Sequence, residues 1–115
     1  MKSRRYVLLA LAGLFVSVSA WRCAGPIRES QLKLGLWAAE NNLWDEALFR
    51  WKKEVAARPR SAAAHNNLAV ALEKKGLWEE ARREYEEALK LAPADSRIKA
   101  NFQSYKDNLE APRKG

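Results

Sequence analysis

The chain has 115 residues, which is enough for one compact domain. Apolar residues make up 48% of the chain and include five Trp, so a hydrophobic core is feasible. The chain has only one Cys and one His, which excludes a disulfide framework and leaves too few ligands for a typical zinc site. The net charge of the whole chain is +7, but three of its 21 basic residues fall within residues 1–20. The other 95 residues carry 18 basic and 14 acidic side chains, which gives them a net charge of +4. Because these charges alternate in sign, we expect no nucleic-acid partner.

Residues 1–20 have the layout of a secretory signal. Met1–Arg5 is short and basic, and the uncharged run Tyr6–Trp21 would span roughly 24 Å as a helix, short of the ~30 Å core of a bilayer. Val18 and Ala20 form the small-residue pattern of a cleavage site. We therefore predict an exported protein, periplasmic or secreted, or one anchored at the cell envelope if this segment is retained. Membrane contact is expected only through this segment.

Residues 21–27 read as a linker that contains the lone cysteine. Cys23 lies where the lipid-modified Cys of a bacterial lipoprotein would lie, although Trp21 and Arg22 stand where such signals have small residues. Lipidation of Cys23 is thus one alternative; the others are an exported thiol that pairs between chains and an ordinary linker residue.

An internal repeat of 34 residues organises the rest of the chain. The shift aligns Leu43-Trp44 with Leu77-Trp78, Glu46-Ala47 with Glu80-Ala81, and Pro59 with Pro93. A fixed period of this size is typical of stacked repeats, and apolar residues within each unit recur at helical steps of three and four. We predict five helices, over residues 29–41, 44–57, 62–75, 78–91 and 96–109.

The ends of these helices carry local signals. Asn and Gly in the turns tolerate a left-handed backbone, acidic pairs suit the first turn of a helix, and Ser or Asp can cap its N-terminus. The last helix has an apolar stripe and polar residues opposite, as expected of a helix that closes an array. These signals are Asn41-Asn42 and Lys75-Gly76 for the turns, Asp45-Glu46 and Glu79-Glu80 for the first turns, Ser61 and Asp95 for the caps, and Ile98, Phe102, Tyr105 and Leu109 for the stripe.

The second unit resembles the tetratricopeptide repeat (TPR) family at Leu68-Ala69, Gly76-Leu77-Trp78, Ala81, Tyr85, Ala88 and Pro93. The first unit matches at Leu34-Gly35, Trp44, Ala47, Trp51 and Pro59, and departs at Ala38 and at Glu54, where the second unit has Ala88. The resemblance implies an all-α, helix-turn-helix repeat array of about two and a half repeats and five helices, a TPR-like α-solenoid. The units are residues 28–61 and 62–95, followed by a capping helix over 96–109 and a flexible tail over 110–115.

In that family geometry the first helix of each pair lines a concave groove. Asn side chains there suit the backbone of an extended peptide, Leu and Val offer an apolar strip, and basic residues suit an acidic group. The alternative is a solvated surface without a ligand. A clamp for C-terminal carboxylates, known in one subclass, is mostly absent because Leu32 and Leu36 replace its first Lys and Asn. The candidate groove residues are Leu32, Lys33, Leu36, Asn66, Asn67, Val70, Lys74, Arg97 and Asn101.

Catalytic motifs are not apparent in the sequence. His65, the single His, lies on one stripe with Leu68 and Leu72, which favours a core role over a catalytic one. We predict neither a cofactor nor a metal. The sequence therefore favours a non-enzymatic module that binds a protein or peptide in its groove. The alternative is an assembly component that forms homo-oligomers or stacks on another helical protein through its convex or end surfaces.

Overall fold

The computed structural model describes residues 30–111, and the predicted signal segment, the linker with Cys23 and residues 112–115 lie outside this range. The described residues form five α-helices and no strands. They are α1 (Gln31–Glu40), α2 (Trp44–Ala57), α3 (Ala62–Lys74), α4 (Trp78–Leu91) and α5 (Ser96–Glu110).

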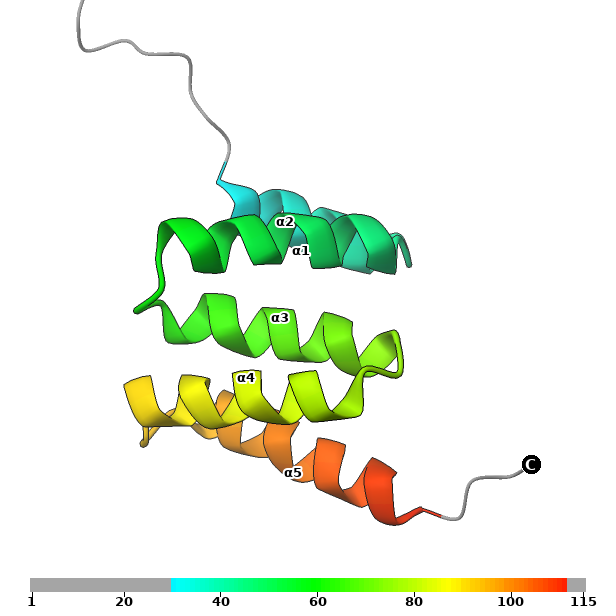
Figure 1. The fold of residues 1–115 in the computed structure, drawn as a ribbon, viewed down its shortest axis with the longest axis vertical. Coiled ribbons are helices and arrows are strands. Elements are labelled where there is room, and N and C mark those ends of the chain that lie inside the picture. The colour runs from blue at the N-terminus through cyan, green and yellow to red at the C-terminus, as the bar shows by residue number, and fades with distance from the viewer. Residues whose placement is uncertain (1–29, 112–115) are drawn as a thin grey trace, which may run out of the picture.

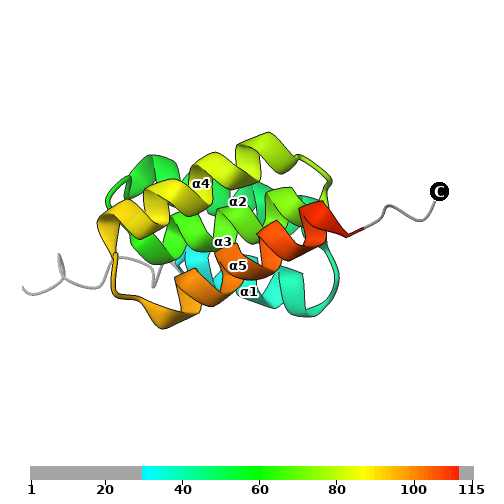
Figure 2. The same cartoon turned by 90° about the horizontal axis from the view of Figure 1, so that it is seen from below.

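The helices stack in chain order from α1 and α2 at one end to α5 at the other (Figure 1). Seen along the stack, α2 and α4 lie toward one side and α1 and α5 toward the other (Figure 2). The main contacts join successive helices, and α5 also touches α3. The predicted all-α helical repeat array is therefore confirmed. Within residues 30–111, no helix combines the length and apolarity that crossing a bilayer would need.

Side-chain caps determine where three of the helices begin. The Ser61 hydroxyl accepts a hydrogen bond from the Ala64 amide at 3.2 Å, and Asp95 accepts one from the Ile98 amide at 3.1 Å, as predicted. Ser30 does the same for the Lys33 amide at 3.3 Å and has extended backbone angles. The first helix thus begins at Gln31, two residues after the predicted start at residue 29, because Ser30 caps the helix and is not part of it.

The turns within each unit use the left-handed backbone that the sequence indicates. Asn42 has φ 59° and Gly76 has φ 75°, and each lies in the turn that joins the two helices of its unit. Such angles are available to Gly and, among other residues, are tolerated best by Asn. Each turn reverses the chain, so that α1 packs on α2 and α3 on α4 as helical hairpins.

The core lies between the hairpins and combines small residues with aromatic ones. Ala47 and Ala81 are fully buried on α2 and α4, which lets the paired helices approach closely. One helical turn further on, Trp51 donates through its indole to the Leu32 carbonyl oxygen of α1, and Tyr85 packs against Phe102 and Tyr105 of α5. Trp51 and Tyr85 are each at most 2% exposed. The sequence pattern of small and aromatic residues therefore corresponds to the packing of this array.

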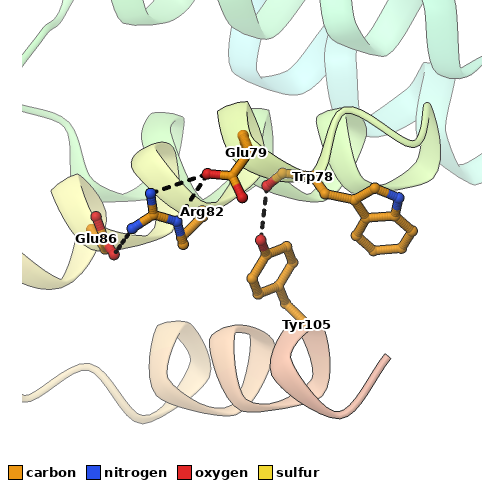
Figure 3. Close-up of polar contacts among 5 residues, drawn as sticks. All are labelled: Trp78, Glu79, Arg82, Glu86 and Tyr105. Carbon is orange, nitrogen blue, oxygen red and sulfur yellow. Dashed lines mark hydrogen bonds and ion pairs between the residues drawn. The ribbon is translucent and has the colours of Figure 1, made fainter. Parts of the chain in front are cut away.

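Aromatic packing fastens α5 to α4. The Tyr85 ring stacks on Phe102 with ring centroids 5.5 Å apart, and Tyr105 lies 6.0 Å from the Trp78 ring. The Tyr105 hydroxyl donates a hydrogen bond to the Trp78 carbonyl oxygen at 2.8 Å (Figure 3). The predicted stripe of α5 is thus largely the surface that packs on α4, with Leu109 remaining 36% exposed.

Charged residues beside these contacts form pairs along single helices. On α4, Arg82 donates to Glu79 at 3.1 Å and to Glu86 at 3.0 Å (Figure 3). On α2, Glu54 replaces the small residue of the family pattern; it is only 4% exposed and accepts from Arg58 at 2.6 Å. The departure at Glu54 is therefore accommodated by an ion pair with a cation one turn further on.

Because Tyr85 and Tyr105 are buried, we expect the protein to lose stability at alkaline pH. Burial raises the pKa of Tyr85, and the neighbouring Glu73 carboxylate raises it further; burial also raises the pKa of Tyr105. Since unfolded tyrosine ionises near pH 10, the folded chain holds these protons at higher pH than the unfolded chain. The free energy of unfolding should be unaffected by these groups below about pH 10 and should fall as the pH rises above it.

Denaturant titrations from about pH 8 to about pH 11 measure this effect. The Tyr85→Phe variant, which has no phenolic proton at that position, should lose less stability over the range than the native chain. Equal losses in the two proteins would contradict the assignment to Tyr85.

Candidate functional site

The predicted groove residues all belong to the helices that begin each unit, α1, α3 and α5. We call this set the inner face. It is not uniformly accessible, because α3 lies in the middle of the array and is packed by its neighbours. The exposed members are Lys33, Leu36, Lys74 and Arg97; Leu32, Asn67, Val70 and Asn101 are half-buried, and Asn66 is buried.

Three asparagines at the centre of the inner face form a hydrogen-bonded chain. The Asn101 amide nitrogen donates to Asn66 Oδ1 at 3.0 Å, and the Asn66 amide nitrogen donates to Asn67 Oδ1 at 3.3 Å. Asn66 is 2% exposed, so its side chain joins α3 to α5 and does not face solvent. The expectation that Asn66 would contact a partner is corrected on this point: it positions the other two.

The ends of this chain keep opposite hydrogen-bonding capacity. Among residues 30–111, neither the Asn67 amide nitrogen nor the Asn101 amide oxygen has a hydrogen-bond partner, and both side chains are half-buried. Within this range, the three hydrogen-bonded asparagines thus present a free donor at Asn67 and a free acceptor at Asn101. A donor and an acceptor together are the complement of one peptide group of an extended polypeptide. Val70, one turn along α3 from Asn66, is also half-buried and packs against the core.

The basic residues of the inner face differ in how they are used. Lys74 places its ammonium 5.6 Å from the centre of the Trp44 ring, a cation–π contact within the chain. Lys33 on α1 and Arg97 on α5 are exposed, and neither takes part in an ion pair of the described residues. Positive charge outside the described ion pairs is therefore accessible on α1 and α5, whereas the asparagine chain between them is uncharged.

A second polar link was not recognisable from the sequence. Glu73 accepts from the Tyr85 hydroxyl at 3.0 Å and from the Asn108 amide at 2.8 Å, so that one carboxylate of α3 joins α4 and α5. Asn108 is 35 residues away, and no local signal predicts such a contact. The link makes Glu73 part of the scaffold beside the inner face.

The contacts of His65 indicate a structural role for this residue. Its Nδ1 lies 2.6 Å from Glu84 Oε2 and its Nε2 lies 2.7 Å from the Pro59 carbonyl oxygen, and the residue is 6% exposed. Both ring nitrogens are occupied by atoms of the chain, so neither is available to act on a substrate. This contact joins α3, α4 and the loop before α3, in agreement with the predicted interhelical role.

A surface hollow lies at the turn between α1 and α2. It is lined by Trp37, Asn42, Leu43, Trp44, Asp45 and Glu46.

The comparison with family models agrees with this geometry. Residues 62–95 match the family model described as "Tetratricopeptide repeat". The matched residues comprise α3, α4 and the loop that follows α4. No curated protein matches the chain. The hairpin of α1 and α2 has the same architecture 34 residues earlier, and α5 occupies the place of the next first helix. The match covers one repeat, α3 with α4, and residues 30–111 form a TPR-like helical repeat array.

Proposed function

We propose that this protein is a non-enzymatic interaction module that binds an extended segment of a protein partner across its inner face. Repeats of the family matched by residues 62–95 generally mediate protein–protein interaction. The observation that carries the proposal is the asparagine chain on α3 and α5, which leaves the Asn67 donor and the Asn101 acceptor without partners within residues 30–111. A half-buried polar group that a ligand satisfies contributes more than one that is fully solvated.

The neighbouring residues indicate the character of the bound segment. Leu36, which is 43% exposed, and Val70 offer apolar contact, while Lys33 and Arg97 favour acidic groups toward the ends of the segment. We therefore expect a polypeptide with apolar residues at its centre and at least one flanking carboxylate.

We also propose that the module works outside the cytoplasm. The support is the sequence of Met1–Trp21, with its basic start, uncharged run and small residues at positions 18 and 20. The mass of the protein isolated from cells separates the alternatives: loss of about 20 residues indicates cleavage, retention of all 115 residues indicates an anchor, and a diacylglycerol adduct at Cys23 indicates a lipoprotein.

Photocrosslinking in cells tests the binding face. A photoreactive phenylalanine analogue at Val70 should yield an adduct with a partner protein, and the same analogue at exposed Gln103 serves as a control position. Introducing Asn67→Ala should reduce the Val70 adduct by about 5-fold to 30-fold, since a hydrogen bond to a half-buried group contributes roughly 1–2 kcal/mol. The helical circular dichroism of the variant should be unchanged.

A Val70 adduct whose yield is the same with and without Asn67→Ala would contradict the role of the asparagine chain. Equal adducts from Val70 and Gln103 would contradict a specific inner face. Asn67→Ala also removes the acceptor of the Asn66 amide, so the unchanged circular dichroism is the check that the helices remain folded.

A further inference from the structure

The N-terminal end of the array exposes a residue that its counterparts bury. Trp37 on α1, Ala71 on α3 and Tyr105 on α5 follow one another at intervals of 34 residues, so they occupy the same position in successive repeats. Ala71 is fully buried and Tyr105 is 1% exposed, whereas Trp37 is 57% exposed. Tyr105 packs against Trp78 of the preceding hairpin. Within residues 30–111 no hairpin precedes α1, which explains why Trp37 has no such neighbour.

Trp37 belongs to a continuous exposed stripe. Lys33, Leu36, Trp37 and Glu40 follow one another at steps of three, one and three, which places them on one side of α1. We call this set the α1 stripe. All four residues are exposed, and the ion pairs of residues 30–111 include neither Lys33 nor Glu40. The stripe therefore has an apolar centre with a free cation before it and a free anion after it.

This order of side chains is complementary to itself when the helix is reversed. If two α1 helices pair antiparallel about a two-fold axis between residues 36 and 37, Leu36 of each meets Trp37 of the other. Lys33 of each helix then faces Glu40 of the other, so that both charges are paired twice. A parallel pairing would place Lys33 against Lys33 and Glu40 against Glu40. The charge pattern thus selects the antiparallel arrangement.

We propose that the α1 stripe is a homodimer contact in which two copies of this chain join antiparallel through α1. The exposed apolar residues at its centre supply the attraction, and the flanking pairs fix the orientation. An anionic membrane surface fits less well, because Glu40 would face lipid headgroups of its own sign. The contact involves one ten-residue helix from each copy, so it falls in the class of weak interfaces below about 1,200 Å².

Charge reversal tests the orientation as well as the contact. The full 115-residue chain in mild detergent is measured by sedimentation velocity from about 10 µM to about 1 mM, the range in which weak interfaces are populated. The native chain should shift from monomer to dimer with rising concentration. Lys33→Glu and Glu40→Lys should each weaken dimerisation by about tenfold, because each creates two repulsive pairs. An equimolar mixture of these two variants should recover dimers, since every pair is again of opposite sign.

Matched controls separate the stripe from the overall charge. Lys52→Glu and Glu80→Lys make the same changes of charge at exposed residues of α2 and α4 that belong to no ion pair in residues 30–111, and should leave dimerisation unchanged. Trp37→Ala should abolish the dimer over the same concentrations while preserving the helical circular dichroism, because more than half of its side chain is solvated in the monomer.

Several results would overturn the proposal. The native chain could stay monomeric at about 1 mM, which would exclude a populated contact. Dimers could persist in Trp37→Ala and in both charge reversals, which would assign association to another surface or to the apolar run Tyr6–Trp21. Lys33→Glu and Glu40→Lys could each leave dimerisation unchanged while Trp37→Ala abolishes it, which would indicate parallel helices, because each reversal then replaces one like-charge pair with another. The α1 stripe shares Lys33 and Leu36 with the inner face, but Asn67 belongs only to the inner face and Trp37 only to the stripe. A failure of the dimer and a failure of the binding face are therefore distinguishable by comparing Asn67→Ala with Trp37→Ala.

Discussion

Replacing Tyr85 with alanine should lower the free energy of unfolding by about 3–5 kcal/mol, which is most of the stability expected of so small an array. Tyr85 is fully buried, and its ring lies 5.5 Å from both Phe102 and Tyr105. Its removal leaves a cavity at the junction of α3, α4 and α5 and leaves α5 without its principal aromatic neighbour. Urea denaturation followed by far-ultraviolet circular dichroism measures the change.

The Tyr85→Phe variant is the matched control, because it keeps the ring and removes only the hydroxyl that donates to Glu73 at 3.0 Å. It should cost about 1 kcal/mol, the usual contribution of one hydrogen bond. If Tyr85→Ala and Tyr85→Phe were equally stable, aromatic packing against α5 would not hold the array together.

Gly35→Ala should destabilise the protein by about 1–3 kcal/mol, although alanine is the better helix former. Gly35 is buried in α1, and a Cβ atom at this position would lie 2.5 Å from Cδ1 of the Trp51 indole and would overlap its Nε1. The indole is held in place because its N–H donates to the Leu32 carbonyl oxygen at 3.2 Å and the residue is 2% exposed. Either the ring or the helix must therefore move.

A double-mutant cycle with Trp51→Leu isolates this clash. Trp51→Leu is destabilising by itself, but adding Gly35→Ala to it should cost little or should stabilise the helix by up to about 1 kcal/mol, since the indole is gone. Thermal unfolding of the four proteins gives the coupling energy. A gain in stability from Gly35→Ala in the native background would show that α1 and α2 do not approach as closely as described.

The helices and their turns could be read from the sequence because their signals are local. Asp95 caps α5, Gly76 has the left-handed angle of a turn, and acidic residues occupy the first turns of α2 and α4, all as predicted. Each signal acts through backbone groups within a few residues, so a single sequence contains the needed information. The 34-residue period then indicates that the hairpins stack, because neither can bury its apolar face alone.

The accessibility of the inner face could not be read in the same way. Asn66 and Asn67 are adjacent polar residues on one helix, yet one is buried and the other half-buried, because Asn101 of α5 approaches Asn66. Trp37 shows the converse: the equivalent residues Ala71 and Tyr105 are buried, but no neighbouring hairpin is present to cover Trp37 in residues 30–111. Which side of a helix is covered depends on contacts about 35 residues away, and periodicity alone does not report them.

Because each helix packs mainly on its neighbours in the sequence, such a protein could be lengthened by inserting a further repeat. Ala71 and Tyr105 occupy equivalent positions, each on a helix that packs against the hairpin before it. A duplicated copy of residues 62–95 placed after residue 95 would meet Tyr85 and Trp78 on one side and present the same two residues to α5 on the other. The surface between successive hairpins is therefore compatible with a further copy of the same hairpin, and segmental duplication would lengthen the inner face without redesign of the core.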